Sequence, residues 1–254
     1  LLVKSAFGLF NVLAFTARLS LSGLLFRRAR DFATSRLSHW PSCCPPHVAT
    51  VWEVDFSRVA MLRKKHKAAW QERHGVNLTF TSFILKATVD ALKAHPVLNA
   101  SLDGKKMIYH RDINLGIAVA LDWGLIVPVI KNAGELNLLG LTRRAGDLAE
   151  RARNKKLNFD EVQNGTFTIT NPGVFGSLFG MGIINQPNVA ILSTGSIEKK
   201  AIVKETEFGD AVFVRSVMYL TLGYDHRIID GAYGSQFLVE IKKYLESYTG
   251  SQDV

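Results

Sequence analysis

The alternation of apolar and polar residues divides most of the chain into short strands and amphipathic helices. Residues 47–56 alternate with a period of two, which predicts a strand. The segment that follows is predicted as a helix, with Ser57 as its N-cap and Gly75 as its end. Three further segments are predicted as helices: the amphipathic 81–96, which ends at Pro96, 139–157 with mixed charges on its outer face, and 231–248.

Apolar and β-branched runs between these helices predict the remaining strands. Asp103 and Gly104 have the composition of a tight turn between two of them. The predicted strands are 98–102, 106–110, 113–121, 124–132, 165–170, 188–197, 199–203 and 211–225. Strands that do not alternate strictly with helices favour a mixed α+β domain over residues 46–254, with flanking helices.

The first 45 residues differ from the rest in composition. They hold six basic side chains and one acidic side chain, whereas the other 209 residues hold 25 basic and 21 acidic ones. This segment suits an organellar transit peptide, an amphipathic segment or a non-native terminus, and its uncharged runs are too short to span a membrane. The remainder is only mildly basic and has no nucleic-acid-binding motif, so nucleic acid is not an expected partner.

A polar cluster follows the apolar run 211–222. The stretch YDHRIIDGA places His226, Arg227 and Asp230 where a strand is predicted to end. A neutral imidazole in such a loop can take a proton near neutral pH, which makes His226 a candidate general base. The alternative is a surface turn in which His226 and Asp230 pair without a catalytic role.

A second candidate is the corner that follows the predicted strand 165–170. Thr170 ends this strand immediately before Asn171, Pro172 and Gly173. A hydroxyl at such a corner can donate a hydrogen bond to a developing oxyanion. Taken alone, the pattern is equally that of a β-branched strand followed by a turn.

Several other chemistries lack their motifs. The sequence has no GxSxG elbow, phosphate loop, GxGxxG or zinc-ligand spacing, so neither a serine hydrolase nor a metal site is expected. The cysteines are Cys43 and Cys44 alone, which excludes a disulfide framework. A base without a protein nucleophile implies a substrate that supplies its own thiol or hydroxyl.

Four motifs together resemble the catalytic domain of the 2-oxoacid dehydrogenase acyltransferases, the E2 components. They are LTFTSFILKA, DINLGIAVAL…GLIVPVIKNA, GTFTITNPGVFGSLFGMGIINQPNVAIL and YDHRIIDGA, in the order that the family has. The segment TITNPGVFGS looks most like the dihydrolipoamide succinyltransferase branch. The resemblance implies the chloramphenicol acetyltransferase fold and trimers that assemble into a cubic or dodecahedral core with E1 and E3 components.

The same resemblance implies the roles of individual residues. His226 would remove the proton of a thiol, Thr170 of a neighbouring subunit would stabilise the oxyanion, and Asp230 would orient the loop through an ion pair. Coenzyme A and dihydrolipoamide would be the substrates, the latter carried on a lipoyl domain that the recognised motifs do not include. The expected coenzyme A contacts are Arg63, Thr79, Asn171, Gly195 and, in a shorter loop, Asp122.

Two departures from the family pattern bear on these expectations. The stretch before His47 reads HWPSCCPP where relatives have arginines and lysines, one of which can pair with the aspartate of the motif, so the usual arginine partner of Asp230 is not expected in this stretch. Gly182 stands where relatives have proline.

The alternatives left open are an acetyl- or branched-chain-specific E2, an O-acetyltransferase and a non-catalytic core subunit. The expected location is the bacterial cytoplasm, or the mitochondrial matrix if residues 1–45 are a transit peptide.

Overall fold

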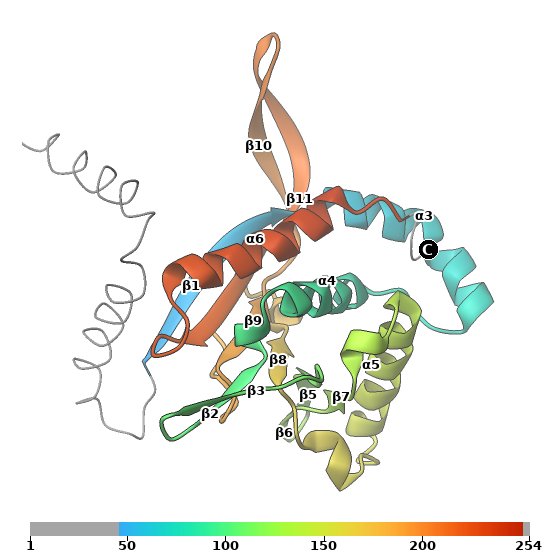
Figure 1. Cartoon of the computed structure of the whole chain (residues 1–254). Coiled ribbons are helices and arrows are strands. Elements are labelled where there is room, and N and C mark those ends of the chain that lie inside the picture. Colours follow the sequence, from blue (N-terminus) through green and yellow to red (C-terminus); the bar gives the residue numbers. More distant parts are fainter. Residues whose placement is uncertain (1–45, 251–254) are drawn as a thin grey trace, which may run out of the picture. The chain divides into compact units, whose positions relative to one another are not determined.

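A mixed β-sheet runs through the centre of the computed structural model, which describes residues 46–250 (Figure 1). Its strand order is β1-β11-β9-β8-β4-β7, and β10 pairs with β11. Strand β8 is parallel to β4 and β9, while the other pairs are antiparallel. The bounds are β1 (His47–Asp55), β4 (Leu115–Ile117), β7 (Val129–Ile130), β8 (Phe167–Thr170), β9 (Ala190–Thr194), β10 (Glu198–Thr206) and β11 (Gly209–Asp225). The predicted α+β class is confirmed.

The predicted helices are confirmed with their ends shifted by a few residues. They are α3 (Ser57–His74), α4 (Phe80–Ala94), α5 (Leu138–Arg153) and α6 (Gly231–Ser247). Gly75 ends α3 in the left-handed conformation, with φ of 71°, as predicted. Ser57 is not the N-cap, because its hydroxyl instead accepts a hydrogen bond of 2.8 Å from the backbone N–H of Ser216 on β11.

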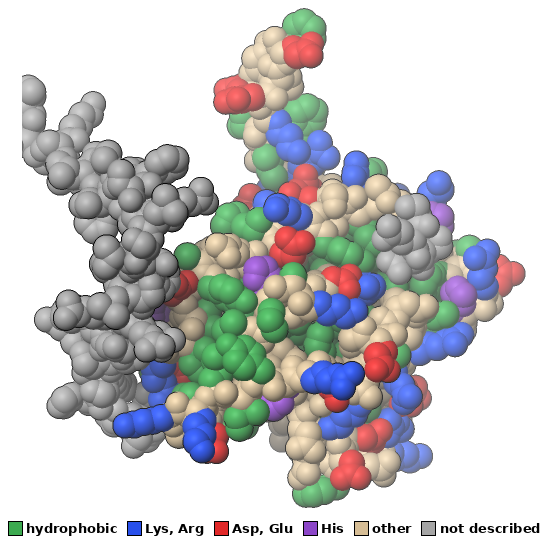
Figure 2. All heavy atoms as spheres, viewed as in Figure 1, with side chains coloured by type: hydrophobic (Ala, Val, Ile, Leu, Met, Phe, Trp, Pro, Cys, Tyr) green, Lys and Arg blue, Asp and Glu red, His purple; other side chains and the backbone are tan. Residues whose placement is uncertain are grey.

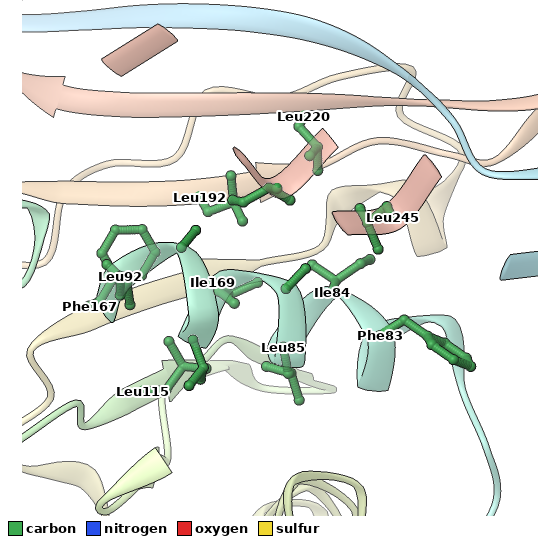
Figure 3. Packing of buried hydrophobic residues seen from close by; sticks show 14 of the residues in the cluster. Phe83, Ile84, Leu85, Leu92, Leu115, Phe167, Ile169, Leu192, Leu220 and Leu245 are labelled. Atoms are coloured by element: carbon green, nitrogen blue, oxygen red, sulfur yellow. The ribbon is translucent and has the colours of Figure 1, made fainter. Parts of the chain in front are cut away.

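The hydrophobic core lies between one face of the sheet and the helices α4 and α6. Figure 3 shows Phe167, Ile169, Leu192 and Leu220 of the sheet pointing toward buried residues of α4, among them Ile84. Because side chains alternate along a strand, the neighbouring residues belong to the opposite face of the sheet. That opposite face carries buried hydroxyl groups, namely Thr168, Ser193 and Thr221.

The predicted strands 113–121 and 124–132 are wrong in extent. Each is broken into two short strands, so that β5 (Val119–Leu121) and β6 (Gly124–Ile126) form a hairpin outside the main sheet. The backbone N–H of Ala118 still donates to Ile169, but Pro128 has no N–H with which to continue a ladder. The turn at Asp103 and Gly104 is confirmed between β2 (Ala100–Asp103) and β3 (Lys106–Tyr109).

Strand β11 is longer than any other strand described, with 17 residues. Its first half pairs with β10 in a hairpin that projects from the body of the domain (orange in Figure 1). The hairpin carries hydrophobic and charged side chains on its surface (Figure 2). The second half of β11 lies between β1 and β9 in the sheet. The segment 1–45, which was expected to be separate from the acyltransferase domain, lies outside the described residues.

Candidate active site

His226 lies in the turn between β11 and α6. The turn is closed by the backbone carbonyl of Asp225, which accepts hydrogen bonds from the N–H groups of Ile228 and Ile229 at 3.1 and 3.0 Å. The imidazole of His226 is exposed, and its ring centroid lies 6.1 Å from that of Tyr224. Within residues 46–250 no side chain or backbone group is hydrogen-bonded to this imidazole. Its reactive nitrogens are therefore available to a substrate.

An ion pair flanks His226 in the sequence. The carboxylate of Asp225 accepts hydrogen bonds from Arg227 at 3.0 Å from Nε and 2.5 Å from Nη2, and the backbone N–H of Arg227 donates to it at 3.0 Å. The side chain of Asp225 is only 3% exposed. Hydrogen bonding to this carboxylate raises the pKa of the Arg227 guanidinium. Sequence reasoning missed this pair, although the opposite charges on the two sides of His226 were visible.

Asp230 is the N-cap of α6. Its carboxylate accepts a hydrogen bond of 2.7 Å from the backbone N–H of Tyr233, which satisfies a free donor of the first helical turn. The part of the chain that the structure describes contains no ion pair of Asp230. The cap fixes where α6 begins, so Asp230 holds the far end of the turn that carries His226.

Thr170 is the last residue of β8 and pairs with Ser193 of β9. It is partly exposed, and the chain turns directly after it into a short 3₁₀ helix at Pro172–Phe175. Gly173 of this helix touches the backbone of Gly195, which follows β9. A Cβ atom on Gly195 would stand 1.9 Å from the carbonyl oxygen of Leu178, so only glycine fits there. This close approach fixes the corner that carries the Thr170 hydroxyl.

The sheet register separates Thr170 from His226 within one chain. Thr170 is opposite Ser193, whereas the N–H of Asp225 donates to Val189 at the other end of β9. At about 3.3 Å per residue and about 4.8 Å between strands, the Cα atoms of Thr170 and Asp225 are about 16 Å apart. A general base and an oxyanion donor must both lie within about 3 Å of the reacting group. The two candidates therefore cannot serve one reaction within a single subunit.

Two of the expected coenzyme A contacts meet at the corner between α3 and α4. Arg63 donates from Nε to the carbonyl of Leu78 at 2.9 Å, and its guanidinium lies 4.4 Å from the ring centroid of Phe80. Thr79 caps α4 and is exposed, with its hydroxyl 3.0 Å from that of Ser82. The guanidinium and the hydroxyl are donors suited to phosphate groups.

The other expected contacts lie at the same end of the sheet as Thr170. Asn171 and Gly195 follow the carboxyl ends of β8 and β9. Asp122 is exposed in the turn of the β5–β6 hairpin, which continues beyond β4, the parallel neighbour of β8. The corner of α3 and α4 belongs to this end too, because the ring of Phe80 contacts that of Phe56 directly after β1. The residues expected to contact coenzyme A thus lie at the same end of the sheet as Thr170, and His226 lies at the other end.

A strongly apolar surface segment follows Thr170, and sequence reasoning did not identify it. Val174, Phe175, Met181 and Ile183 are each 70% or more exposed in the stretch 172–187. Gly182 in this segment donates its N–H to the hydroxyl of Ser193 at 3.1 Å, a bond that the proline of relatives would not make. Exposed apolar side chains gathered in one segment are typical of protein–protein, membrane or ligand-binding sites.

The described part of the chain contains no cluster of three or more His, Cys, Asp or Glu side chains that could hold a metal ion. None of the helices described within residues 46–250 is long and apolar enough to cross a membrane.

Comparison with known proteins identifies the family of the chain. The sequence model of the 2-oxoacid dehydrogenases acyltransferase (catalytic domain) matches residues 29–251. The chain belongs to this acyltransferase family. The match begins within the segment 1–45, ahead of the domain boundary that composition suggests.

Relatives of two acyl specificities are similar to the chain. The dihydrolipoyllysine-residue acetyltransferase component of the pyruvate dehydrogenase complex of Mycobacterium bovis is 49% identical over 197 residues, which are 76% of this chain and 36% of the relative. The dihydrolipoyllysine-residue succinyltransferase component of the 2-oxoglutarate dehydrogenase complex of Bacillus subtilis is 44% identical over 200 residues, 78% and 47% of the two chains. The chain therefore spans less than half the length of either relative.

Solved structures are similar over most of the chain. A probable dihydrolipoamide acetyltransferase from Listeria monocytogenes has a TM-score of 0.79 and 36% identity, covering 95% of this chain and 99% of that one. The cubic core of a pyruvate dehydrogenase multienzyme complex has a TM-score of 0.75 and 34% identity, with coverage of 87% and 88%. Chloramphenicol acetyltransferase has a TM-score of 0.55 at 17% identity, covering 85% and 94%, which confirms the predicted fold.

Proposed function

We propose that the chain transfers an acyl group between dihydrolipoamide and coenzyme A, with each active site formed by two subunits of a homotrimer. The separation of Thr170 and His226 carries this proposal, because each end of the sheet holds half of the groups that thiol–thioester exchange requires. A neighbouring copy that brings its Thr170 to His226 completes the site. The exposed apolar segment 172–187 lies directly after Thr170 and is suited to that contact.

The arrangement supports a mechanism without a protein nucleophile. His226 takes the proton of the attacking thiol, and the thiolate adds to the carbonyl carbon of the thioester. The hydroxyl of Thr170 from the neighbouring subunit donates to the carbonyl oxygen as it gains negative charge. When the tetrahedral intermediate collapses, the carbon–sulfur bond to the second thiol breaks, and the imidazolium of His226 returns the proton to that sulfur.

Coenzyme A fits the donors at the Thr170 end of the sheet. The guanidinium of Arg63 and the hydroxyl of Thr79 are suited to its phosphates, and the Asn171 side chain has no hydrogen-bond partner within residues 46–250. Asp122 and Gly195 are the remaining proposed contacts. The lipoyl group would arrive on a lipoyl domain outside these residues, which supply no lipoyl attachment motif.

For the acyl group we propose succinyl, on the basis of the segment TITNPGVFGS. Relatives of both the acetyl and the succinyl kind are similar to the chain, so acyl preference must be measured directly. We propose further that trimers form a cubic or dodecahedral core that binds E1 and E3 components. The solved cubic core among the similar structures supports the first form. The bacterial relatives support a cytoplasmic location, and the mitochondrial alternative depends on residues 1–45.

A side-by-side assay tests the activity. Acetyl-, succinyl- and isobutyryl-dihydrolipoamide are offered with coenzyme A, and new thioester is measured for the wild type and for His226→Ala. We expect the succinyl group to transfer fastest and the variant to lose about 10²–10⁴-fold in kcat while it still folds. A variant that keeps more than half of the wild-type rate would reduce His226 to a turn residue. Fastest transfer of acetyl or isobutyryl would overturn the acyl assignment alone.

A further inference from the structure

We propose that the Asp225–Arg227 ion pair is a positioning device that holds His226 in its reactive orientation, an inference that rests on the proposed function. His226 has no hydrogen-bond partner of its own within residues 46–250, so its place depends on the backbone that carries it. That backbone is bounded on both sides by the two members of the pair.

Asp225 uses every polar group that it has to shape the turn. Its N–H donates to Val189 at 2.9 Å, which ties the end of β11 to β9. Its carbonyl accepts from Ile228 and Ile229, which closes the turn. Its carboxylate accepts from the backbone N–H and the guanidinium of Arg227. One residue thus fixes the chain immediately before, across and after His226.

Arg227 adds a constraint that a backbone turn alone does not have. Its guanidinium folds back over two residues to reach the carboxylate with both Nε and Nη2. A two-pronged contact restricts the direction as well as the distance of the side chain. His226 is the residue between these two anchors, so the backbone angles on either side of it have little freedom.

The burial of the pair favours a positional role. The Asp225 side chain is 3% exposed and that of Arg227 is 34% exposed. Removing a carboxylate from water is unfavourable, and the attraction within a buried ion pair often recovers no more than this cost. Stability alone is therefore a weak explanation for a buried pair, and the position of this one on both sides of the proposed base favours a role in placing that base.

The residue before Asp225, Tyr224, lies beside the His226 imidazole and is itself held in place. Tyr224 is fully buried, and its hydroxyl lies 3.1 Å from that of Thr50 on β1. Its ring lies 6.1 Å from the His226 ring at an angle of 34°. The Tyr224 side chain points into the core while Asp225 points to the other face of the sheet, so the end of β11 is anchored on both faces.

The test compares Arg227→Gln, Asp225→Asn and the double variant in the full, assembled protein, and adds Arg227→Ala for chemical rescue. We expect kcat to fall by about 10–100-fold in each, because a misplacement of about 1 Å can cost about 100-fold. The KM for coenzyme A should stay near its wild-type value, since the proposed coenzyme A contacts lie at the other end of the sheet. Added guanidinium at low concentration should restore part of the rate in Arg227→Ala.

Arg151→Gln is the matched control. Arg151 also makes two-pronged contacts, with Glu161 at 2.6 Å from both Nη atoms and with Asp147, but it lies on α5. Its loss should lower the melting temperature and leave kcat unchanged. Variants of the Asp225–Arg227 pair that fold and turn over as fast as the wild type would overturn the proposal. A single variant can fail to fold because it leaves one charge buried alone. The double variant removes both charges, and its kcat then shows whether the pair positions His226.

A crystal structure of Arg227→Gln separates this inference from the proposed function. We expect residues 225–229 to occupy more than one conformation, and this observation does not depend on activity. An unchanged single conformation would contradict the positioning role even in an active protein. A wild-type chain that does not transfer acyl groups would contradict the proposed function, while a disordered turn in the variant would still support the positioning role.

Discussion

The hydroxyl of Thr170 and the imidazole of His226 each stand where a paired strand ends. Thr170 is the last residue of β8, and His226 follows the last residue of β11. Both positions combine a backbone fixed by its neighbours with a polar group directed away from the hydrophobic core. Loops that leave a rigid sheet have this combination, which is why a sequence pattern of an apolar run followed by a polar cluster could indicate both residues.

Thr170→Val tests the proposed oxyanion donor. Valine keeps the shape and the β-branch of threonine but has no hydroxyl, so a bond that matters only in the transition state is lost. We expect kcat to fall by about 10²–10³-fold with little change in the KM for coenzyme A, measured by steady-state kinetics on the assembled oligomer. Thr170→Ser should retain much of the rate.

Thr168→Val is the matched control for this substitution. Thr168 lies two residues earlier on the same face of β8, is buried, and has no hydrogen-bond partner for its hydroxyl within the described residues. Its loss should leave kcat unchanged. A Thr170→Val protein with the wild-type kcat would reduce Thr170 to a strand former, and a raised KM alone would make it a contact for coenzyme A.

Helices α4, α5 and α6 could be predicted from the sequence because each has an apolar face. Helix α3 buries only Val59 and Trp70, and its end at Gly75 was the clearer signal. The strands between 113 and 132 could not, since their apolar run has no feature that separates β4 from β5. The point at which the chain leaves the main sheet depends on a hydrogen bond from Ala118 to Ile169, more than 45 residues away in the sequence. The Asp225–Arg227 pair was missed for a related reason, because adjacent opposite charges are usually solvated and burial is set by the whole sheet.

A partly exposed ion pair between α5 and the short 3₁₀ helix Phe159–Val162 gives a prediction at the scale of elements. The guanidinium of Arg151 donates to Glu161, and this bond lowers the pKa of the Glu161 carboxyl from 4.5 to about 2. The carboxylate therefore stabilises the folded state at a pH above 4.5, and this contribution is lost as the pH falls through about 2.

Glu161→Gln should remove that pH dependence. We expect the variant to be less stable than the wild type by at most about 1 kcal/mol above pH 5, as is usual for a partly exposed pair, and the difference to vanish near pH 2. Denaturant unfolding at a series of pH values measures it. Asp160→Asn, at an adjacent exposed carboxyl with no ion pair within residues 46–250, is the matched control. A constant difference at every pH would contradict the assigned role of Glu161.

At the scale of the molecule, the two halves of the candidate site belong to opposite ends of one sheet. The motifs that indicated Thr170 and His226 are local in the sequence, so they could predict each half. That the halves lie about 16 Å apart follows only from the register of β8, β9 and β11. The resemblance had implied a site shared between neighbouring subunits, and the register supplies a physical reason why one subunit alone is insufficient.

Mixed assemblies test this sharing directly. Thr170→Val chains keep His226, and His226→Ala chains keep Thr170, so each assembly made from one variant alone should be nearly inactive. In a trimer that contains both variants, one of the three interfaces joins an intact His226 to an intact Thr170. Random co-assembly of equal amounts makes roughly three-quarters of the trimers mixed, which should restore roughly a quarter of the wild-type kcat. Co-expression of the two variants in equal amounts makes the mixed protein, and the same variants assembled separately and then combined are the control. Mixed trimers as inactive as the parents would show that the site does not form between Thr170 of one subunit and His226 of the next.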